Sequence, residues 1–176
     1  MQGAGRRSVT TIACCSLVLG ALLSGGAVAG AGSAVAATPA PPCKGDQLSA
    51  SASGSSQVTV TVTNKGTKPC TLRGFPTVAL AGQGSPERNK PLNVRRQGGD
   101  GPVRLAVGGR AVTHLTFTPV LGEAEGYCAS GADPFVAPSL VVGFAGIKEQ
   151  LASTDADGFA LCGNTVRVTA FRPAGS

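Results

Sequence analysis

The chain has 176 residues, with 15 Lys+Arg against 9 Asp+Glu and a formal net charge of +6. The charge excess is too mild to indicate a nucleic-acid partner; it favours solubility and loose attachment to anionic surfaces. The aromatic residues are 6 Phe and 1 Tyr without Trp, so the core is lean in large side chains.

Residues 1–37 are predicted to be a secretory signal peptide. Arg6 and Arg7 form a basic start, Ile12 to Val28 is a mostly apolar run without charge, and Ala34-Val35-Ala36 supplies a small-residue cleavage motif. An uncleaved membrane anchor is the alternative, because the apolar run is barely long enough to span a bilayer. Its glycines and the cleavage motif favour removal, by either the general secretory or the twin-arginine route. We therefore expect a secreted or extracellular protein, with cell-wall association as a variant, that contacts the membrane through this segment alone.

About 139 residues remain after cleavage, which is the size of one domain. They retain 13 Lys+Arg, because Arg6 and Arg7 are removed, against 9 Asp+Glu, a net charge of +4. Thr38–Pro42 (TPAPP) holds three prolines in five residues, so we expect an extended leader that does not pack. Residues 43–173 are predicted to form the folded domain, and residues 174–176 a tail.

Four cysteines remain after cleavage, because Cys14 and Cys15 belong to the discarded segment. They are Cys43, Cys70, Cys128 and Cys162. An even number in an exported chain predicts two disulfides, with three connectivities open, and the spacing favours Cys43–Cys70 and Cys128–Cys162. Each bridge would contribute about 3.5 kcal/mol in the chain-entropy model. A zinc site is the rival use of four cysteines, but these four contain no C-x₂₋₄-C pair.

Alternating and β-branched runs separated by turn-forming residues predict about eight short strands, the first of them weak in composition, and no helix. In chain order the nine runs are Gln47–Ser53, Gln57–Asn64, Cys70–Phe75, Thr77–Ala81, Val103–Val107, Arg110–Val120, Ser139–Phe144, Ile147–Ala152 and Asn164–Phe171; Thr77–Ala81 resumes the strand that begins at Cys70, after a bend at Pro76. The clearest is Gln57–Asn64, where Val58, Val60 and Val62 face one way and the threonines face the other. The pattern predicts an all-β, immunoglobulin-like antiparallel β-sandwich with two disulfides.

Several connections carry their own predictions. Gly108-Gly109 is a two-glycine hairpin signal between the runs on either side of it. Glu87–Arg104 is polar with few apolar anchors, and Leu121–Pro138 is the longest irregular stretch. We expect both to be connections without regular structure.

No catalytic residue, cofactor or metal ion is predicted. His114 is the single histidine, and its place in an alternating run predicts a solvent-facing strand residue. Ser153–Gly158 contains the D-x-D-G core of a calcium loop, but Asn164 stands where a bidentate Glu is needed, so a plain hairpin turn is expected. Gly98–Pro102 lacks the phosphate-loop pattern and is expected to be a flexible connection.

One locally basic region is predicted to contact an anionic polymer. It comprises Arg88, Lys90, Arg95, Arg96 and Arg104, against Glu87 and Asp100. The plain interpretation is a solvated charged loop. The functional interpretation is attachment to phosphate-rich polymers or acidic headgroups of the cell envelope, driven by counterion release.

Three stretches carry a family pattern: Val60–Asn64, the string Cys70-Thr71-Leu72-Arg73-Gly74-Phe75-Pro76 and Val103–Ala111, and the late Cys128 and Cys162 also fit it. In these features the chain resembles the secreted domain of unknown function 4232 family, which is common in high-GC Gram-positive bacteria. It implies a secreted or envelope-tethered β-sandwich with two disulfides. It implies no catalytic residue, because none is assigned to the family.

The sequence therefore predicts an exported, non-enzymatic β-sandwich that has a binding or structural role at the cell envelope or in the medium. Its partner is predicted to be an anionic envelope polymer or an extracellular protein. The alternative is a secreted protease inhibitor that presents Leu121–Pro138 as a loop next to Cys128. An enzyme is the third hypothesis.

Overall fold

The computed structural model describes residues 38–82, 87–122 and 126–175. The predicted signal peptide, residues 1–37, lies outside the described residues. Thr38 to Ser176 form a compact unit of their own. Among the described residues, no helix has the length and apolar character needed to cross a membrane.

The described part of this unit contains one single-turn 3₁₀ helix and fourteen strands. They are η1 (Gly45–Gln47), β1 (Leu48–Ser53), β2 (Gln57–Asn64), β3 (Cys70–Leu72), β4 (Thr77–Ala81), β5 (Asn89–Pro91), β6 (Asn93–Gln97), β7 (Val103–Leu105), β8 (Arg110–Phe117), β9 (Phe135–Ala137), β10 (Ser139–Phe144), β11 (Ile147–Ala152), β12 (Phe159–Leu161), β13 (Thr165–Thr169) and β14 (Arg172–Pro173).

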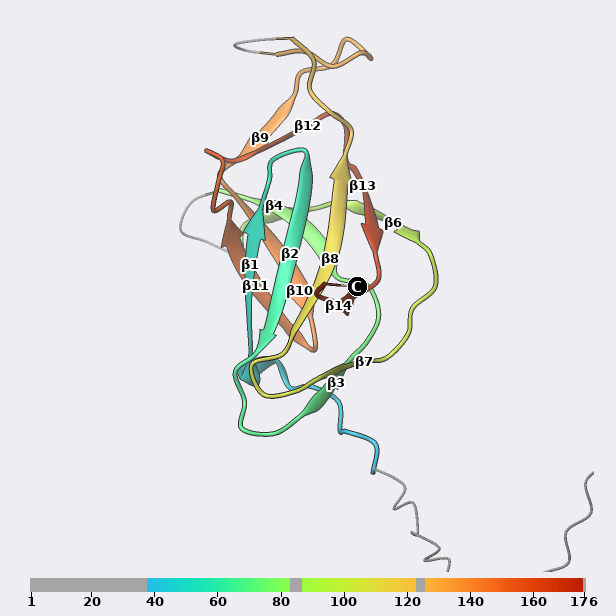
Figure 1. Ribbon diagram of the computed structural model, residues 1–176. Coiled ribbons are helices and arrows are strands. Elements are labelled where there is room, and N and C mark those ends of the chain that lie inside the picture. Colours follow the sequence, from blue (N-terminus) through green and yellow to red (C-terminus); the bar gives the residue numbers. More distant parts are fainter. Residues whose placement is uncertain (1–37, 83–86, 123–125, 176) are drawn as a thin grey trace, which may run out of the picture. The chain divides into compact units, whose positions relative to one another are not determined.

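Two sheets pack face to face (Figure 1). The large sheet has the strand order β1-β2-β8-β13-β6, with β14 also paired to β8, and the second sheet has the order β11-β10-β4-β5. Every pair in these sheets is antiparallel except β13–β6, which is parallel. The inward side chains of both sheets form one apolar cluster, in which Phe117, Leu115 and Leu140 are almost completely buried.

The predicted alternation places the correct side chains in this core. Val58, Val60 and Val62 of β2 are buried, while the threonines between them are partly exposed. On β8 the buried positions likewise alternate with outward ones. Burial of each such valine or leucine contributes about 1.5–3 kcal/mol relative to exposure, so the period-two pattern both forms the strand and fixes which face turns inward.

Two small sheets lie at opposite ends of the sandwich, β3–β7 at one and β9–β12 at the other (Figure 1). Each disulfide belongs to one end. Cys43–Cys70 joins the segment before η1 to β3, and Cys128–Cys162 joins the loop after β8 to the residue after β12. The all-β sandwich with these two bridges is confirmed. Neither bridge connects the two large sheets, in contrast to the intersheet bridge of antibody domains.

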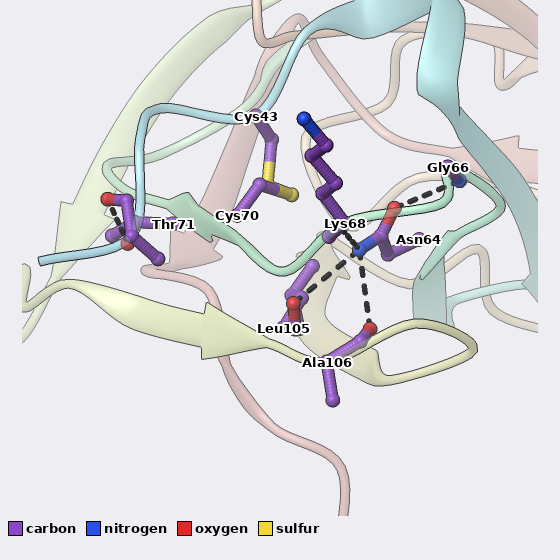
Figure 2. The surroundings of a disulfide bond; sticks show 9 residues. Cys43, Asn64, Gly66, Lys68, Cys70, Thr71, Leu105 and Ala106 are labelled. Atoms are coloured by element: carbon purple, nitrogen blue, oxygen red, sulfur yellow. Dashed lines mark hydrogen bonds between the residues drawn. A yellow bond between two sulfur atoms is a disulfide. The ribbon is translucent and has the colours of Figure 1, made fainter. Parts of the chain in front are cut away.

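A buried asparagine organises the end that carries Cys43–Cys70. Asn64 is completely buried at the end of β2, and its Nδ2 donates to the carbonyl oxygens of Lys68, Leu105 and Ala106 at 3.0, 3.3 and 3.1 Å. Its Oδ1 accepts a hydrogen bond from the Gly66 N–H at 2.9 Å. Figure 2 shows these bonds beside the disulfide. One side chain therefore connects the turn after β2 to the chain that leaves β7.

The paired glycines do not form the predicted hairpin. β7 pairs with β3, and β8 pairs with β2, β13 and β14, so the turn carries the chain from a small sheet to the large one. Gly108 has a positive φ of 73°, which glycine adopts without strain. Its N–H donates to the Asn64 carbonyl, and the Gly109 carbonyl accepts from the Asn64 N–H, both at 2.9 Å. Through these two hydrogen bonds the Gly108-Gly109 turn pairs with Asn64 at the end of β2.

The Pro-rich leader is extended, but the expectation that it does not pack is wrong. The Pro41 carbonyl accepts a hydrogen bond from the Thr71 N–H at 2.7 Å, and the Ala40 carbonyl accepts one from the Thr71 hydroxyl at 3.0 Å. The Cys43 N–H in turn donates to the Thr71 carbonyl at 2.9 Å. Proline lacks a donor but keeps its acceptor, so this segment can lie along one edge of β3.

Two stretches that were expected to be irregular contain strands. The polar connection Glu87–Arg104 includes β5 and β6, which are edge strands of the two sheets. The long stretch Leu121–Pro138 ends in β9, whose partner β12 was also missed. These strands have three to five residues. β5 pairs with the nearby β4, whereas β6 pairs with β13 and β9 pairs with β12, which lie farther away in the sequence.

The acidic turn Ser153–Gly158 joins β11 to β12, which belong to different sheets, so it is not the predicted hairpin turn. Asp155 Oδ1 accepts hydrogen bonds from the Gly54 N–H at 2.6 Å and from the Ser153 hydroxyl at 3.0 Å. The Ser153 region also pairs with Ala52 of β1. Asp155 thus connects this turn to the β1–β2 turn.

These hydrogen bonds predict an acid-sensitive contact. The Gly54 N–H, followed by the Ser153 hydroxyl, lowers the pKa of Asp155 below the ordinary value of 3.8. A lowered pKa in the folded state means that the stabilisation is present above the unfolded-state pKa and is lost as the pH falls through the folded-state value. Asp155→Asn should therefore reduce the free energy of unfolding at pH 7 and flatten its decline below about pH 4. Urea titrations at pH 7 and pH 3 measure both effects, and an unchanged pH profile in the variant would contradict this role.

Candidate functional site

The outward face of the large sheet is polar and rich in hydroxyl groups. Its outward positions are Ser49, Ser51 and Ser53 on β1; Gln57, Thr59, Thr61 and Thr63 on β2; Arg110, Val112, His114 and Thr116 on β8; Thr165, Arg167 and Thr169 on β13; and Asn93, Arg95 and Gln97 on β6. We call this surface the outer face. None of these residues is Asp or Glu, so the outer face carries positive charge without a carboxylate to neutralise it.

Arginines from three strands gather toward the β6 edge of this face. Arg95 and Arg167 are direct partners in the parallel β6–β13 pair, and both are exposed. The Arg172 guanidinium lies against Gly98, just after β6, since a Cβ added at Gly98 would be 3.4 Å from Arg172 Nη2. Like charges this close repel one another, so the edge favours an anionic partner.

Among the described residues, none of these arginines forms an ion pair with an acidic side chain. Within residues 38–82, 87–122 and 126–175, the ion pair found joins Arg73 to Asp100 at 3.5 Å, and both side chains are largely exposed. Asp100 is the acidic residue that follows β6 in sequence, and its carboxylate pairs with Arg73. The charge of the β6 edge is therefore available to a ligand.

The five basic residues predicted from sequence do not form one cluster. Arg95 lies on the outer face, whereas Arg96 points to the other side of β6, with its guanidinium carbon 5.5 Å from the centre of the Phe75 ring. Lys90 is on β5 in the second sheet, where its Nζ lies 3.4 Å from the centre of the Phe135 ring, and Arg88 is two residues before it. Arg104 is on β7, opposite Thr71 of β3.

His114 faces solvent on the outer face, as its alternating run predicts. Its Nδ1 lies 3.2 Å from the Thr59 hydroxyl oxygen, and the two residues are cross-strand partners. A working nucleophile and base need a third group that orients the base. None of the outward residues around this pair is a carboxylate, and the described residues hold no group of three His, Cys, Asp or Glu side chains that could bind a metal ion.

A family model described as "Domain of unknown function (DUF4232)" matches residues 43–172. The chain belongs to this family. The DUF4232 match begins at Cys43 and ends in β14, so it includes both disulfides and every strand of the outer face. Searches of curated proteins and of solved structures found no match to the chain.

Sequence reasoning missed Arg110 and Arg167 on the outer face of the DUF4232 domain, and also Arg172 on the neighbouring β14. Each is a single charge in an apolar or small-residue context, so no local charge run marks it. Arg167 joins Arg95 because β6 pairs in parallel with β13. The alternation of Thr165, Arg167 and Thr169 with buried valines was the available signal that this arginine faces outward.

Proposed function

We propose that this DUF4232 domain is an exported, non-enzymatic module that binds a phosphate-rich anionic polymer of the cell envelope through the outer face. The observation that carries the proposal is the Arg95–Arg167 pair on a hydroxyl-rich face without a carboxylate. Guanidinium groups form two parallel hydrogen bonds to a phosphate, and binding releases the counterions of the polymer. Serine and threonine hydroxyl groups can bond to the remaining phosphate and sugar oxygens.

Export is part of the same proposal. The two disulfides support an extracellular location, because disulfides form and persist in oxidising compartments. A non-enzymatic role is supported by the Thr59–His114 pair, which lacks an orienting carboxylate. The net charge of the chain adds a weak general attraction to anionic surfaces.

Retention of the Thr38–Ser176 domain on immobilised polyphosphate and on isolated cell walls tests the proposal. Retention should fall steeply between low and moderate salt, because each neutralised phosphate releases a counterion. Arg95→Gln/Arg167→Gln removes two charges and should reduce the slope of log K against log salt by about 1.4. At moderate salt we expect an affinity loss on the order of tenfold.

Two variants make this test specific. Lys65→Gln/Lys68→Gln removes the same charge from the turn between β2 and β3 and should change retention little. Arg95→Gln/Arg96→Gln should have a smaller effect than Arg95→Gln/Arg167→Gln, because Arg96 points to the other side of β6. Salt-independent retention, or an equal loss in all three variants, would contradict binding by the outer face.

A protease inhibitor is the second candidate function. It is favoured by one observation: Tyr127, next to the bridged Cys128, is 59% exposed, and its backbone forms two hydrogen bonds with Leu121. A bridged, exposed segment of this kind can be presented to a protease. Cleavage by subtilisin-like and trypsin-like enzymes without inhibition would count against this candidate and leave the polymer-binding proposal untouched.

A further inference from the structure

A crevice lies at one end of the second sheet, between β4 and β5 of that sheet and the neighbouring β9. β10 begins at Ser139, which pairs with Ala81 of β4, whereas β9, which precedes it in the chain, pairs with β12 instead. β4 and β5 are thereby separated from β9. The resulting pocket has a volume of about 350 Å³, which lies within the range of small-molecule sites.

A hydrogen-bond network holds the carbonyl groups of two lining residues, Ala81 and Gly82. The Ser139 hydroxyl, which is almost fully buried, donates to the Ala81 carbonyl at 3.1 Å. Gln150 Nε2 donates to the Gly82 carbonyl at 2.9 Å and to Ser139 Oγ at 2.6 Å. These bonds fix the end of β4 relative to the start of β10. The crevice beside them is therefore held in place by the hydrogen bonding of the sheet.

The walls of the crevice are apolar, and two of their side chains are exposed to solvent. Its lining includes Leu80, Ala81, Ala137 and Pro138. Phe135 and Val136 of β9 complete the apolar wall and are 38% and 76% exposed, so Val136 is the most exposed large apolar residue that the structure describes. Exposed apolar side chains on a concave surface are typical of a binding site.

The mouth of the crevice is cationic. Arg88 and Lys90 are both exposed and belong to its lining, which contains no Asp or Glu among the described residues. The Lys90 ammonium lies 3.4 Å from the centre of the Phe135 ring, so positive charge and an aromatic wall are adjacent. An anion held by these two cations would place an attached apolar group against Phe135 and Val136.

We propose that this crevice binds a small amphipathic anion, a phosphate or carboxylate attached to an aromatic ring or a short aliphatic group. The anionic group pairs with Arg88 and Lys90, and the apolar group packs on Phe135 and Val136. Charge complementarity and the apolar wall select this class, because an inorganic anion leaves the wall uncovered and a neutral apolar molecule leaves the cations unpaired. The site uses the second sheet and is independent of the outer face.

Amide chemical-shift titrations of the Thr38–Ser176 domain test the proposal with three probes at equal ionic strength. Phenyl phosphate carries both groups, inorganic phosphate the anion alone, and benzyl alcohol the ring alone. Phenyl phosphate should give saturable shifts at residues 88–90 and 135–137, with a Kd at least tenfold below those of the other two probes. Val136→Asp should weaken the binding of phenyl phosphate at least tenfold, because the substitution puts a carboxylate beside the bound anion. Lys90→Gln should weaken the binding about three- to fivefold.

Matched controls separate the site from general effects. Val107→Asp alters a valine that is 57% exposed in a turn outside the crevice, and Lys68→Gln removes a lysine from another turn; neither should change the Kd. Arg95→Gln/Arg167→Gln should also leave it unchanged, which distinguishes a failure here from a failure of the polymer proposal. Equal shifts with inorganic phosphate, shifts at other residues, or full binding by Val136→Asp would overturn the proposal.

Discussion

Replacing Cys43 and Cys70 by serine is expected to lower the free energy of unfolding by about 3.5 kcal/mol. The bridge spans a sequence separation of 27 residues and Cys128–Cys162 spans 34, so the chain-entropy contributions of the two are nearly equal. Loss of both should cost about 7 kcal/mol, which is a large part of the typical net stability of about 5–15 kcal/mol. The chain has no Trp, so urea titrations followed by far-ultraviolet circular dichroism are the suitable measurement.

Loss of each bridge should affect a different part of the domain, because one bridge is attached to β3 and the other follows β12. These two strands lie at opposite ends of the sandwich (Figure 1). Without Cys128–Cys162, amide exchange should accelerate around the Cys162 N–H, which donates to the Thr118 carbonyl, before it changes in β2 and β8. An identical urea midpoint for the oxidised and reduced protein would contradict a stabilising role for the bridges.

Replacing Asn64 by alanine is expected to cost about 3 kcal/mol, because three carbonyl oxygens and the Gly66 N–H lose a partner in a buried site. Asn64→Asp should cost more at pH 7, since a carboxylate cannot donate to those carbonyls and would be charged where Asn64 is fully buried. At pH 4 and below, protonation restores one donor, so the deficit should shrink. Urea titrations at pH 7 and pH 4 measure this difference.

Thr63→Ala is the matched control, because Thr63 is the preceding residue of β2 and faces outward. Its effect should remain within about 0.5 kcal/mol. A loss of the same small size for Asn64→Ala would show that the network in Figure 2 contributes little.

The fold class could be predicted from the local alternation of residues in the sequence. The way in which the turns connect the strands could not. Alternating β-branched residues predicted β2, β8 and β13, because a period of two is set within each strand. The hairpin expected at Gly108-Gly109 failed because the turn pairs with Asn64, more than forty residues earlier. Short polar strands such as β6 form only when a distant partner supplies the hydrogen bonds.

The candidate site shows the same limit. The local charge run identified Arg95 but also included Arg96, which the alternation of β6 turns to the opposite side. Arg167 could not be found from charge, because it meets Arg95 only through the parallel pairing of β6 with β13. Likewise, asparagine is a residue type that is common in turns. Asn64 can be buried because its side chain bonds to the carbonyl groups of Leu105 and Ala106, at the end of a strand of another sheet.

The most direct test of the proposed function is a map of the polymer contact on the folded domain. Amide shifts of Thr38–Ser176 are recorded while polyphosphate is added at low salt. Binding by the outer face predicts changes concentrated in residues 93–97, 110–116 and 165–169, which disappear in Arg95→Gln/Arg167→Gln. Changes confined to β4, β5 and β9, or spread over all basic residues alike, would contradict it.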